Sequence, residues 1–234
     1  MLIKKQLLNF PFEAVLWDMD GTLIDSEPLW IEQERLLMRS FDVHWTEEDA
    51  IHCLGGPMPR VENYMRSKLS QEIVASLTDS QLTNTLLRRM EERFKKGIEF
   101  AGGSELLLNE IHSSGVPQAL VSASSRALVD SALSAIGEHF FHITVSNDDV
   151  ANPKPNPEGY LKAAEHIGVE ISRCLIIEDS VTGVNAGIAA GAFVLGIPHV
   201  SKLPSAPKVK HHNTLSGLQM KAIPELFGLN VGEN

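Results

Sequence analysis

Long hydrophobic runs are missing from the 234-residue sequence. A membrane-spanning helix needs about 18 or more consecutive apolar residues, and no stretch approaches that length. The first residues, Met1 to Phe12, also lack the apolar segment and the small-residue cleavage site of a secretory signal. We therefore expect a cytoplasmic protein that has no membrane among its partners.

Cysteine is scarce as well, and the two residues, Cys53 and Cys174, lie far apart. Neither has the neighbours of a zinc-binding motif, so we expect buried free thiols rather than a disulfide. The adjacent pair His211 and His212 has no other candidate ligand nearby in sequence, which argues against a zinc site there. Nucleotide-binding loops of the forms Gly-x-x-x-x-Gly-Lys and Gly-x-Gly-x-x-Gly are also absent.

Basic residues are outnumbered, with 20 Lys and Arg against 30 Asp and Glu, which gives a formal net charge of −10. Proteins that bind nucleic acids carry basic patches, so this balance argues against a nucleic acid as the main partner. The composition, with 43% hydrophobic and 21% charged residues, is that of an ordinary globular protein. Nothing in the sequence indicates an obligate assembly, and we expect a monomer.

Short apolar runs alternate with helical patterns along most of the chain, an order typical of a parallel sheet with helices on both faces. We predict an α/β fold with a doubly wound, Rossmann-like parallel sheet. The expected strands are residues 14–17, 117–121, 142–146, 173–177 and 193–197, and the expected helices around them are residues 104–114, 126–136, 158–167, 181–190 and 215–226.

Two further segments of this region carry expectations. Residues 198–213, with three prolines and several basic residues, are predicted to form a long loop. Gly183, Gly187 and Gly191 recur at four-residue spacing in a predicted helix, and we expect this glycine stripe to let the helix approach the sheet closely.

A helical block from Pro28 to Lys96 interrupts the alternation. Its apolar residues recur at helical spacing, and the sequence of residues 46–49 resembles a capped helix start with acidic residues in the first turn. The block is either an inserted domain or a set of helices that pack on the sheet. Residues 54–60, rich in glycine and proline, are expected to form a loop inside it.

The first expected strand, Ala14 to Trp17, ends in two carboxylates, Asp18 and Asp20. Because side chains alternate along a strand, we expect both carboxylates to leave it on the same side. Gly21 then lets the backbone turn sharply. Two carboxylates this close repel one another, and either a shared proton or a divalent cation such as Mg²⁺ removes the repulsion. Both arrangements are typical of an active site.

Polar groups also follow the other expected strands. Ser122 comes after residues 117–121, and Glu178 and Asp179 come after residues 173–177. Lys154 lies in a loop that prolines stiffen, beyond a further strand. Since ligands of such sheets bind beyond the carboxyl ends of the strands, we expect these side chains to meet there. Taken singly, each has a simpler interpretation; Ser124 or Ser125, for example, suits the start of the helix that follows.

The string from Asp18 to Pro28, with an apolar strand in front of it, resembles the first motif of the haloacid dehalogenase superfamily of phosphohydrolases. The segments at Ser122, at Lys154 and at Glu178-Asp179 resemble the three remaining motifs and occur in the same order. The resemblance spans nearly the whole chain and is greatest to the branch that contains sugar-phosphate phosphatases and β-phosphoglucomutases.

The resemblance implies a role for each of these residues. Asp18 would be the nucleophile and Asp20 the general acid and base. Mg²⁺ would be bound by Asp18, Asp179 and Asp20, the last through its backbone carbonyl, with Glu178 acting through water or by orienting the ligands. The phosphoryl oxygens would be held by Ser122, Lys154 and the backbone N–H of Ala123.

The resemblance also implies a domain division. Residues 1–25 and 98–234 would form the α/β core, and residues 26–97 would form a four-helix cap. Relatives use the loop at Gly55 and Gly56 to contact the leaving group of the substrate, and Arg60 is a candidate for the basic residue that some of them carry there. A solvated surface arginine is the simpler alternative for Arg60.

The expected function is therefore Mg²⁺-dependent hydrolysis of a small phosphorylated metabolite, such as a sugar phosphate, through a phosphoaspartyl intermediate. A phosphomutase of the β-phosphoglucomutase type uses the same groups and is the first alternative, although the Gly21-Thr22-Leu23 turn resembles phosphatases more. A non-catalytic phosphate-sensing or scaffold protein is the second, but such a protein is expected to have lost at least one of these groups.

Overall fold

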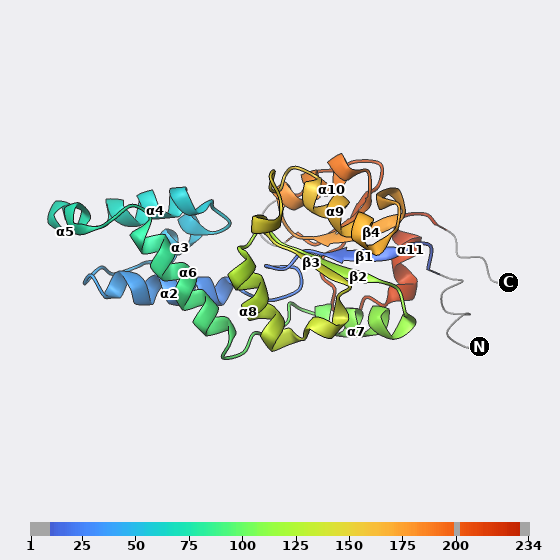
Figure 1. Cartoon of the computed structure of the whole chain (residues 1–234), viewed down its shortest axis with the longest axis horizontal. Coiled ribbons are helices and arrows are strands. Elements are labelled where there is room, and N and C mark those ends of the chain that lie inside the picture. The colour runs from blue at the N-terminus through green and yellow to red at the C-terminus, as the bar shows by residue number, and fades with distance from the viewer. Residues whose placement is uncertain (1–9, 199–201, 230–234) are drawn as a thin grey trace. The chain divides into compact units, whose positions relative to one another are not determined.

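The computed structural model describes residues 10–198 and 202–229 of the chain. They form two compact units (Figure 1). One is the continuous segment Ser26–Ile98, and the other contains the described residues up to Asp25 and from Glu99 onward. The second unit holds the sheet, and the first is entirely helical apart from its turns and loops.

Within residues 10–198 and 202–229 the sheet has six parallel strands in the order β3-β2-β1-β4-β5-β6, so the predicted α/β fold is confirmed. Most residues of the central strands are apolar because helices cover both of their faces, and the polar exceptions, Gln118 of β2 and Glu178 of β4, are buried as well. The five expected strands are present, each within one residue of its expected ends. The strands are β1 (Ala14–Trp17), β2 (Gln118–Val121), β3 (Ile143–Val145), β4 (Cys174–Glu178), β5 (Phe193–Gly196) and β6 (Val209–His211).

Two predictions for the C-terminal region are wrong. Residues 198–213 are not a continuous loop, since they contain β6, a short edge strand in which only Val209 is buried. The helix expected over residues 215–226 is limited to α11 (Ile223–Leu226), which follows a 3-10 turn, η4 (Met220–Ala222). Gly217 has a positive φ of 76°, so the chain turns where the helix was expected to begin.

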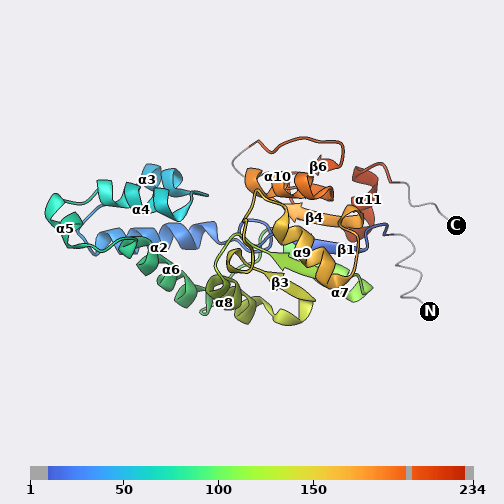
Figure 2. The same cartoon turned by 45° about the horizontal axis from the view of Figure 1, so that its top comes forward.

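Four helices flank the sheet. Figures 1 and 2 show α9 and α10 on one face and α7 and α8 on the other. On the first face, Tyr160, Ala163 and Val184 pack against Leu16 and Ile176 of the sheet in one buried cluster. These helices are α7 (Ser104–Ser114), α8 (Arg126–Ile136), α9 (Glu158–Ile167) and α10 (Val181–Ala190), and the shorter 3-10 turns are η1 (Glu138–Phe140), η2 (Asn147–Asp149) and η3 (Ile171–Arg173).

The register of the central strands brings their carboxyl ends level. Trp17, the last residue of β1, pairs with Leu120 of β2 and with Ile177 of β4. The residues that follow, Asp18 on one strand and Glu178 on the next, therefore lie side by side at the same edge of the sheet. This edge is where a doubly wound sheet binds its ligands.

The helical unit contains five helices, one more than a four-helix cap. The additional element is the short helix α5, which buries none of its side chains and is therefore not part of the packed core. The capped start expected at Thr46 is present, since Thr46 and Asp49 exchange side-chain-to-backbone hydrogen bonds. The helices are α2 (Glu27–Arg39), α3 (Glu47–Cys53), α4 (Met58–Ser67), α5 (Gln71–Ser76) and α6 (Gln81–Phe94).

The core of this unit is mainly apolar, although polar residues such as Glu34, Asp49 and Glu62 are buried as well. Leu37, Met38 and Leu86 pack around Trp45 in a single buried cluster. The carboxylate of Glu34 is also buried, and its Oε2 accepts a hydrogen bond of 3.2 Å from the indole Nε1 of Trp45. A carboxylate among apolar side chains resists ionisation, and burial raises the pKa of Glu34 to about 7.

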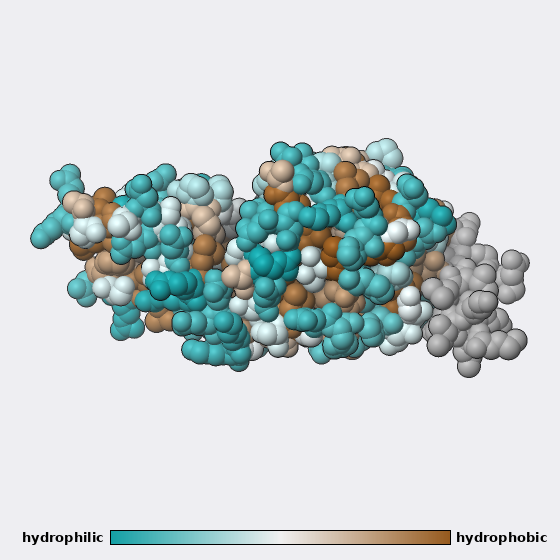
Figure 3. Space-filling view, viewed as in Figure 1, coloured by the Kyte–Doolittle hydropathy of each residue, from teal (hydrophilic) through white to brown (hydrophobic). Residues whose placement is uncertain are grey.

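The surface in view mixes hydrophilic and hydrophobic residues over both units (Figure 3). The strongly exposed large hydrophobic side chains each belong to a different helix: Leu36, Ile51, Leu106, Leu161 and Val181. In the described part of the chain, none of the helices combines the length and the apolar character that crossing a bilayer demands. Both cysteines are buried and free, as expected.

Candidate functional site

Three carboxylates meet at the carboxyl edge of the sheet. Asp18 follows β1, while Glu178 and Asp179 stand at the end of β4, and each offers an oxygen within 4.8 Å of the other two. Gly21 makes the approach of the two segments feasible, because a Cβ at this residue would lie 2.3 Å from Asp179 Oδ2. The hydroxyl of Thr22 donates to Asp179 Oδ1 at 3.0 Å. Residues that are about 160 positions apart in sequence thus form one acidic cluster.

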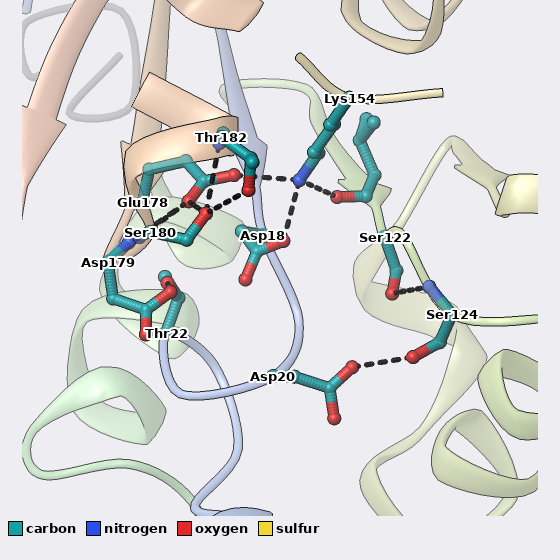
Figure 4. Close-up of polar contacts among 12 residues, drawn as sticks. Asp18, Asp20, Thr22, Ser122, Ser124, Lys154, Glu178, Asp179, Ser180 and Thr182 are labelled. Carbon is teal, nitrogen blue, oxygen red and sulfur yellow. Dashed lines mark hydrogen bonds and ion pairs between the residues drawn. The ribbon is translucent and has the colours of Figure 1, made fainter. Parts of the chain in front are cut away.

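Lys154 supplies the positive charge of this cluster. Its side chain is 6% exposed, and its Nζ lies 2.6 Å from Asp18 Oδ1 and 2.7 Å from Glu178 Oε1 (Figure 4). The same nitrogen donates to the backbone carbonyl of Val121 at 2.8 Å. An ammonium group has three N–H donors, so each of them has an acceptor here. The lysine is held in one position rather than extended into solvent.

The Glu178 carboxylate is fully buried and accepts hydrogen bonds at both oxygens. Oε1 accepts from Lys154 and, at 2.8 Å, from the phenol of Tyr160. Oε2 accepts from the backbone N–H groups of Asp179 and Ser180 and from the Ser180 hydroxyl. Gly183 leaves the space for this carboxylate, since a Cβ at residue 183 would lie 1.5 Å from Oε1.

The charges of the site are unbalanced. Three carboxylates face the single ammonium of Lys154, and all of them are shielded from bulk water to a large degree. Burial, followed by the charges of Glu178 and Asp179, raises the pKa of Asp18 well above its ordinary value, and Lys154 opposes this rise. Burial acts to lower the pKa of Lys154, but the charges of Asp18 and Glu178 outweigh it and raise that pKa. The site therefore favours a further positive charge.

Asp20 does not belong to this acidic cluster. Its side chain points toward Ser124, whose hydroxyl donates to Asp20 Oδ2 at 2.8 Å (Figure 4). Among the carboxylates that raise the pKa of Asp18, Glu178 and Asp179 have the largest effects. The physical reason for the separate position of Asp20 is that β1 ends at Trp17, so the alternation of a strand does not extend to Asp20.

The turn after β2 brings the serines of the second motif to the same edge. Ser122 is buried, and its Oγ accepts a hydrogen bond of 2.9 Å from the backbone N–H of Ser124. Ser125, rather than Ser124, caps helix α8 by accepting from the backbone N–H of Leu128. Ala123 lies between these residues, in the turn from which α8 begins. The two neighbouring serines thus have separate tasks, one toward Asp20 and one toward the helix.

The loop expected over residues 54–60 is limited to residues 54–57, because α4 begins at Met58, and Arg60 of that helix organises the loop. The guanidinium donates to the carbonyl of His52 at 2.9 Å and to that of Leu54 at 3.4 Å, at the C-terminal end of α3. It also lies over Gly56, where a Cβ would come within 2.4 Å of Nη2, and Gly55 has a positive φ of 59°. The guanidinium therefore provides hydrogen-bond donors for carbonyl groups at the end of a helix in its own unit.

Four residues of the site are not among the predicted site residues: Thr22, Ser124, Tyr160 and Ser180. Ser180 and Thr22 stand next to motif residues, and a search for hydroxyls beside each carboxylate finds them. Tyr160 has no such signal, because a tyrosine in the first turns of an amphipathic helix is typical of a core residue. Its contact with Glu178 depends on how α9 packs on the sheet.

Comparisons with known proteins agree with this geometry. Residues 15–197 match the family model described as haloacid dehalogenase-like hydrolase. Among curated proteins, hexitol phosphatase A of Escherichia coli K12 is 26% identical over 84% of this chain and 88% of its own length. The phosphorylated carbohydrates phosphatase of Thermotoga maritima is 30% identical over 80% of this chain and 86% of its own.

Two further matches concern length and fold. The bifunctional riboflavin kinase/FMN phosphatase of Arabidopsis thaliana is 29% identical over 81% of this chain, and the match covers 49% of the length of that relative. The crystal structure of CbbY from Rhodobacter sphaeroides in complex with phosphate superposes with a TM-score of 0.73 at 23% identity, and the match covers 88% of this chain and 96% of CbbY. At this level of identity, the superposition supports the fold.

Proposed function

Because the chain belongs to the haloacid dehalogenase-like hydrolase family, we propose that it hydrolyses a small phosphate monoester, with Asp18 as the nucleophile and Mg²⁺ as the cofactor. The observation that carries the proposal is the contact of Lys154 with Asp18 beside the carboxylates of Glu178 and Asp179. A nucleophilic carboxylate, a fixed cation and a place for a second cation suit phosphoryl transfer through a covalent intermediate.

The residues present fit a magnesium ion. Carboxylate oxygens are the ligands that Mg²⁺ prefers. Burial, together with the negative charges of Glu178 and Asp179, raises the pKa of Asp18, and a divalent cation would offset those charges. We assign Asp18, Asp179 and the backbone carbonyl of Asp20 as ligands. Glu178 is the less suitable candidate, since its two oxygens already accept hydrogen bonds from Lys154, Tyr160 and the start of α10. The ion, when bound, would neutralise charge on the phosphoryl oxygens.

In the first step, an oxygen of Asp18 attacks phosphorus, and the bond from phosphorus to the ester oxygen breaks. Asp20 gives a proton to the departing alkoxide, so that a phosphoaspartyl group and an alcohol result. In the second step, Asp20 takes a proton from a water molecule that attacks the same phosphorus, and Asp18 and free phosphate are released. The hydrogen bond from Ser124 keeps the Asp20 carboxylate oriented, apart from the acidic cluster.

Lys154, Ser122 and the backbone N–H of Ala123 hold the phosphoryl oxygens during both steps. Each lies at the carboxyl edge of the sheet on which Asp18 stands. Their contribution is to fix the group in line with the attacking oxygen and to compensate the charge that develops on it. Because uncatalysed hydrolysis of phosphate monoesters is among the slowest reactions known, loss of any one of these groups is expected to reduce the rate severely.

We propose a phosphorylated sugar or sugar alcohol as the substrate class. The support is the printed activity of two relatives, a hexitol phosphatase and a phosphorylated carbohydrates phosphatase. Residues 26–97 are proposed as the cap that selects the leaving group, with Gly55 and Gly56 in the selecting loop and Arg60 in the first turn of α4 beside it. The assignment of Arg60 stays a prediction, and its guanidinium must break its hydrogen bonds to the α3 carbonyls before it can contact a substrate. A monomeric state and a cytoplasmic location also stay predictions.

The test is a panel of phosphate esters offered to the purified protein with Mg²⁺ and, in parallel, with EDTA. The panel contains hexose, pentose, hexitol and glycerol phosphates, phosphoglycolate and β-glucose 1-phosphate. Release of free phosphate that EDTA abolishes supports the proposal, whereas an isomerised sugar phosphate without release of phosphate identifies a mutase. An inactive protein that EDTA does not affect contradicts both. The Asp18→Asn variant is expected to fold and to be inactive, and an active variant would refute the assignment of the nucleophile.

A further inference from the structure

Tyr160 contacts Lys154, which pairs with the nucleophile Asp18, and Glu178, which pairs with the same lysine. The side chain is fully buried, in the first turn of α9, and its hydroxyl donates to Glu178 Oε1 at 2.8 Å. The same oxygen accepts from Lys154 Nζ at 2.7 Å. The ammonium also lies 4.8 Å from the centre of the Tyr160 ring, within the range of a cation–π contact. One side chain therefore touches the acceptor and the donor of a single ion pair.

We propose that Tyr160 is a positioning residue, which holds the Glu178 carboxylate and directs the Lys154 ammonium toward Asp18 and the phosphoryl group. The proposal rests on the function assigned above to Asp18 and Lys154. Glu178 and Asp18 compete for the same ammonium, at 2.7 and 2.6 Å. A phenol is a hydrogen-bond donor at neutral pH, and its hydrogen bond withdraws negative charge from Glu178 Oε1. That oxygen then attracts Lys154 less strongly, and the ammonium remains available to Asp18.

Loss of the Tyr160 hydroxyl removes one of the hydrogen bonds that the buried oxygen Glu178 Oε1 accepts. Lys154 is the nearest donor that can move to compensate, and such a shift takes it away from Asp18. Phosphoryl transfer is catalysed mainly by positioning and by electrostatic stabilisation of the oxygens in the transition state, so the turnover number is expected to suffer more than substrate binding. The Tyr160→Phe variant retains the ring, its packing and its face toward Lys154.

The chain provides a matched control in the helical unit. Tyr64 is the other tyrosine of the sequence, and its hydroxyl donates to Asp49 Oδ1 at 2.7 Å. Lys68 Nζ lies 2.6 Å from that oxygen and 4.8 Å from the centre of the Tyr64 ring. The arrangement of tyrosine, carboxylate and lysine is the same as at Tyr160, but it belongs to the unit that lacks Asp18. Tyr64→Phe therefore removes an equivalent hydrogen bond without touching the reacting groups.

The experiment compares the wild-type protein, Tyr160→Phe and Tyr64→Phe in steady-state hydrolysis of 4-nitrophenyl phosphate with Mg²⁺. Calorimetric titration with orthovanadate, which mimics the five-coordinate phosphorus of the transition state, is done on the same three proteins. We expect Tyr160→Phe to lower kcat on the order of ten-fold and to weaken vanadate binding by a similar factor, with KM changed by less than about two-fold. Tyr64→Phe is expected to lose a few degrees of thermal stability and to keep wild-type kcat and vanadate affinity.

Each other outcome decides against a part of the account. Wild-type kcat and vanadate affinity in Tyr160→Phe refute the positioning role, as does an equal loss in both variants. A wild-type protein that binds vanadate but hydrolyses no ester refutes the proposed function, and the vanadate affinity of Tyr160→Phe then decides the role of Tyr160 alone. A wild-type protein that neither hydrolyses an ester nor binds vanadate contradicts both proposals.

Discussion

Replacement of Gly183 by alanine tests whether the buried Glu178 carboxylate organises the site. Alanine is the better helix former, and in the middle of a helix it is worth about 1 kcal/mol more than glycine. Stability is nevertheless expected to fall, because the new Cβ would lie 1.5 Å from Glu178 Oε1 and 1.9 Å from its Cδ. Atoms at these distances overlap, so the carboxylate must leave its place.

The cost follows from the hydrogen bonds that Glu178 Oε1 would lose, those from Lys154 and Tyr160. A hydrogen bond to a charged group contributes about 1.5–3 kcal/mol, so the pair is worth about 3–6 kcal/mol. After the gain in helix propensity, the expected net destabilisation is about 2–5 kcal/mol, which an ordinary domain can survive. Since Lys154 loses its orientation, we expect kcat/KM to fall by about 100-fold or more.

Gly187→Ala is the matched control, one turn further along α10. Its Cβ would lie 2.7 Å from Val194 Cγ2 and 3.2 Å from Ile176 Cδ1, so it strains apolar packing and leaves the charged site alone. We expect a destabilisation of about 1–3 kcal/mol in urea unfolding with kcat/KM near the wild-type value. Wild-type activity in Gly183→Ala, or an equal loss of activity in both variants, would refute the reasoning.

Three further outcomes are expected. Because Glu34 is 5% exposed beside Trp45 and burial raises its pKa from 4.5 to about 7, the folded state prefers its protonated form. The contribution of Glu34 to stability is therefore fully present below about pH 4.5 and is lost as pH rises through 7, by up to about 3 kcal/mol. Glu34→Gln should abolish this decline in urea unfolding between about pH 5 and 8, and an unchanged pH dependence would contradict it. Ser124→Ala should lower kcat about three- to ten-fold with an alkyl phosphate, since Asp20 loses the hydroxyl that orients it. Ser124→Thr keeps a hydroxyl and should retain activity. Equal kcat in the wild type and both variants would exclude a role of Ser124 in orienting Asp20. Asp179→Asn should raise the Mg²⁺ concentration for half-maximal activity at least about ten-fold. Because the substitution relieves repulsion with Asp18, the urea concentration at the midpoint of unfolding in EDTA should be unchanged or higher. An unaltered Mg²⁺ dependence would argue against Asp179 as a ligand.

The strands of the sheet could be predicted where helices cover both faces. Residues such as Leu175, Ile176 and Ile177 are apolar in succession because neither side of β4 meets water. The edge strand β6 gave no such pattern, since Lys210 and His211 are exposed and Val209 alone is buried. Short strands with charged residues are common at sheet edges, where they discourage pairing with other chains, and for that reason they look like loops in sequence.

The site was predictable where a residue follows a strand directly. Asp18 and Asp179 do so, and the parallel register brings such positions together. The orientation of Asp20 and the role of Tyr160 depend on turns and on helix packing, which no local pattern specifies. The glycine stripe shows the same limit: Gly187 serves close packing on Val194, as expected, but Gly183 makes room for a charged group.

The most direct test of the central claim is a search for the phosphorylated enzyme. The wild-type protein is mixed with Mg²⁺ and the best ester of the panel, quenched in acid within milliseconds, digested and analysed by mass spectrometry. We predict that the peptide containing Asp18 gains the mass of one phosphoryl group, and that the gain disappears in Asp18→Asn. Rapid hydrolysis without any phosphorylated peptide, or with the phosphoryl group on another residue, would contradict the account.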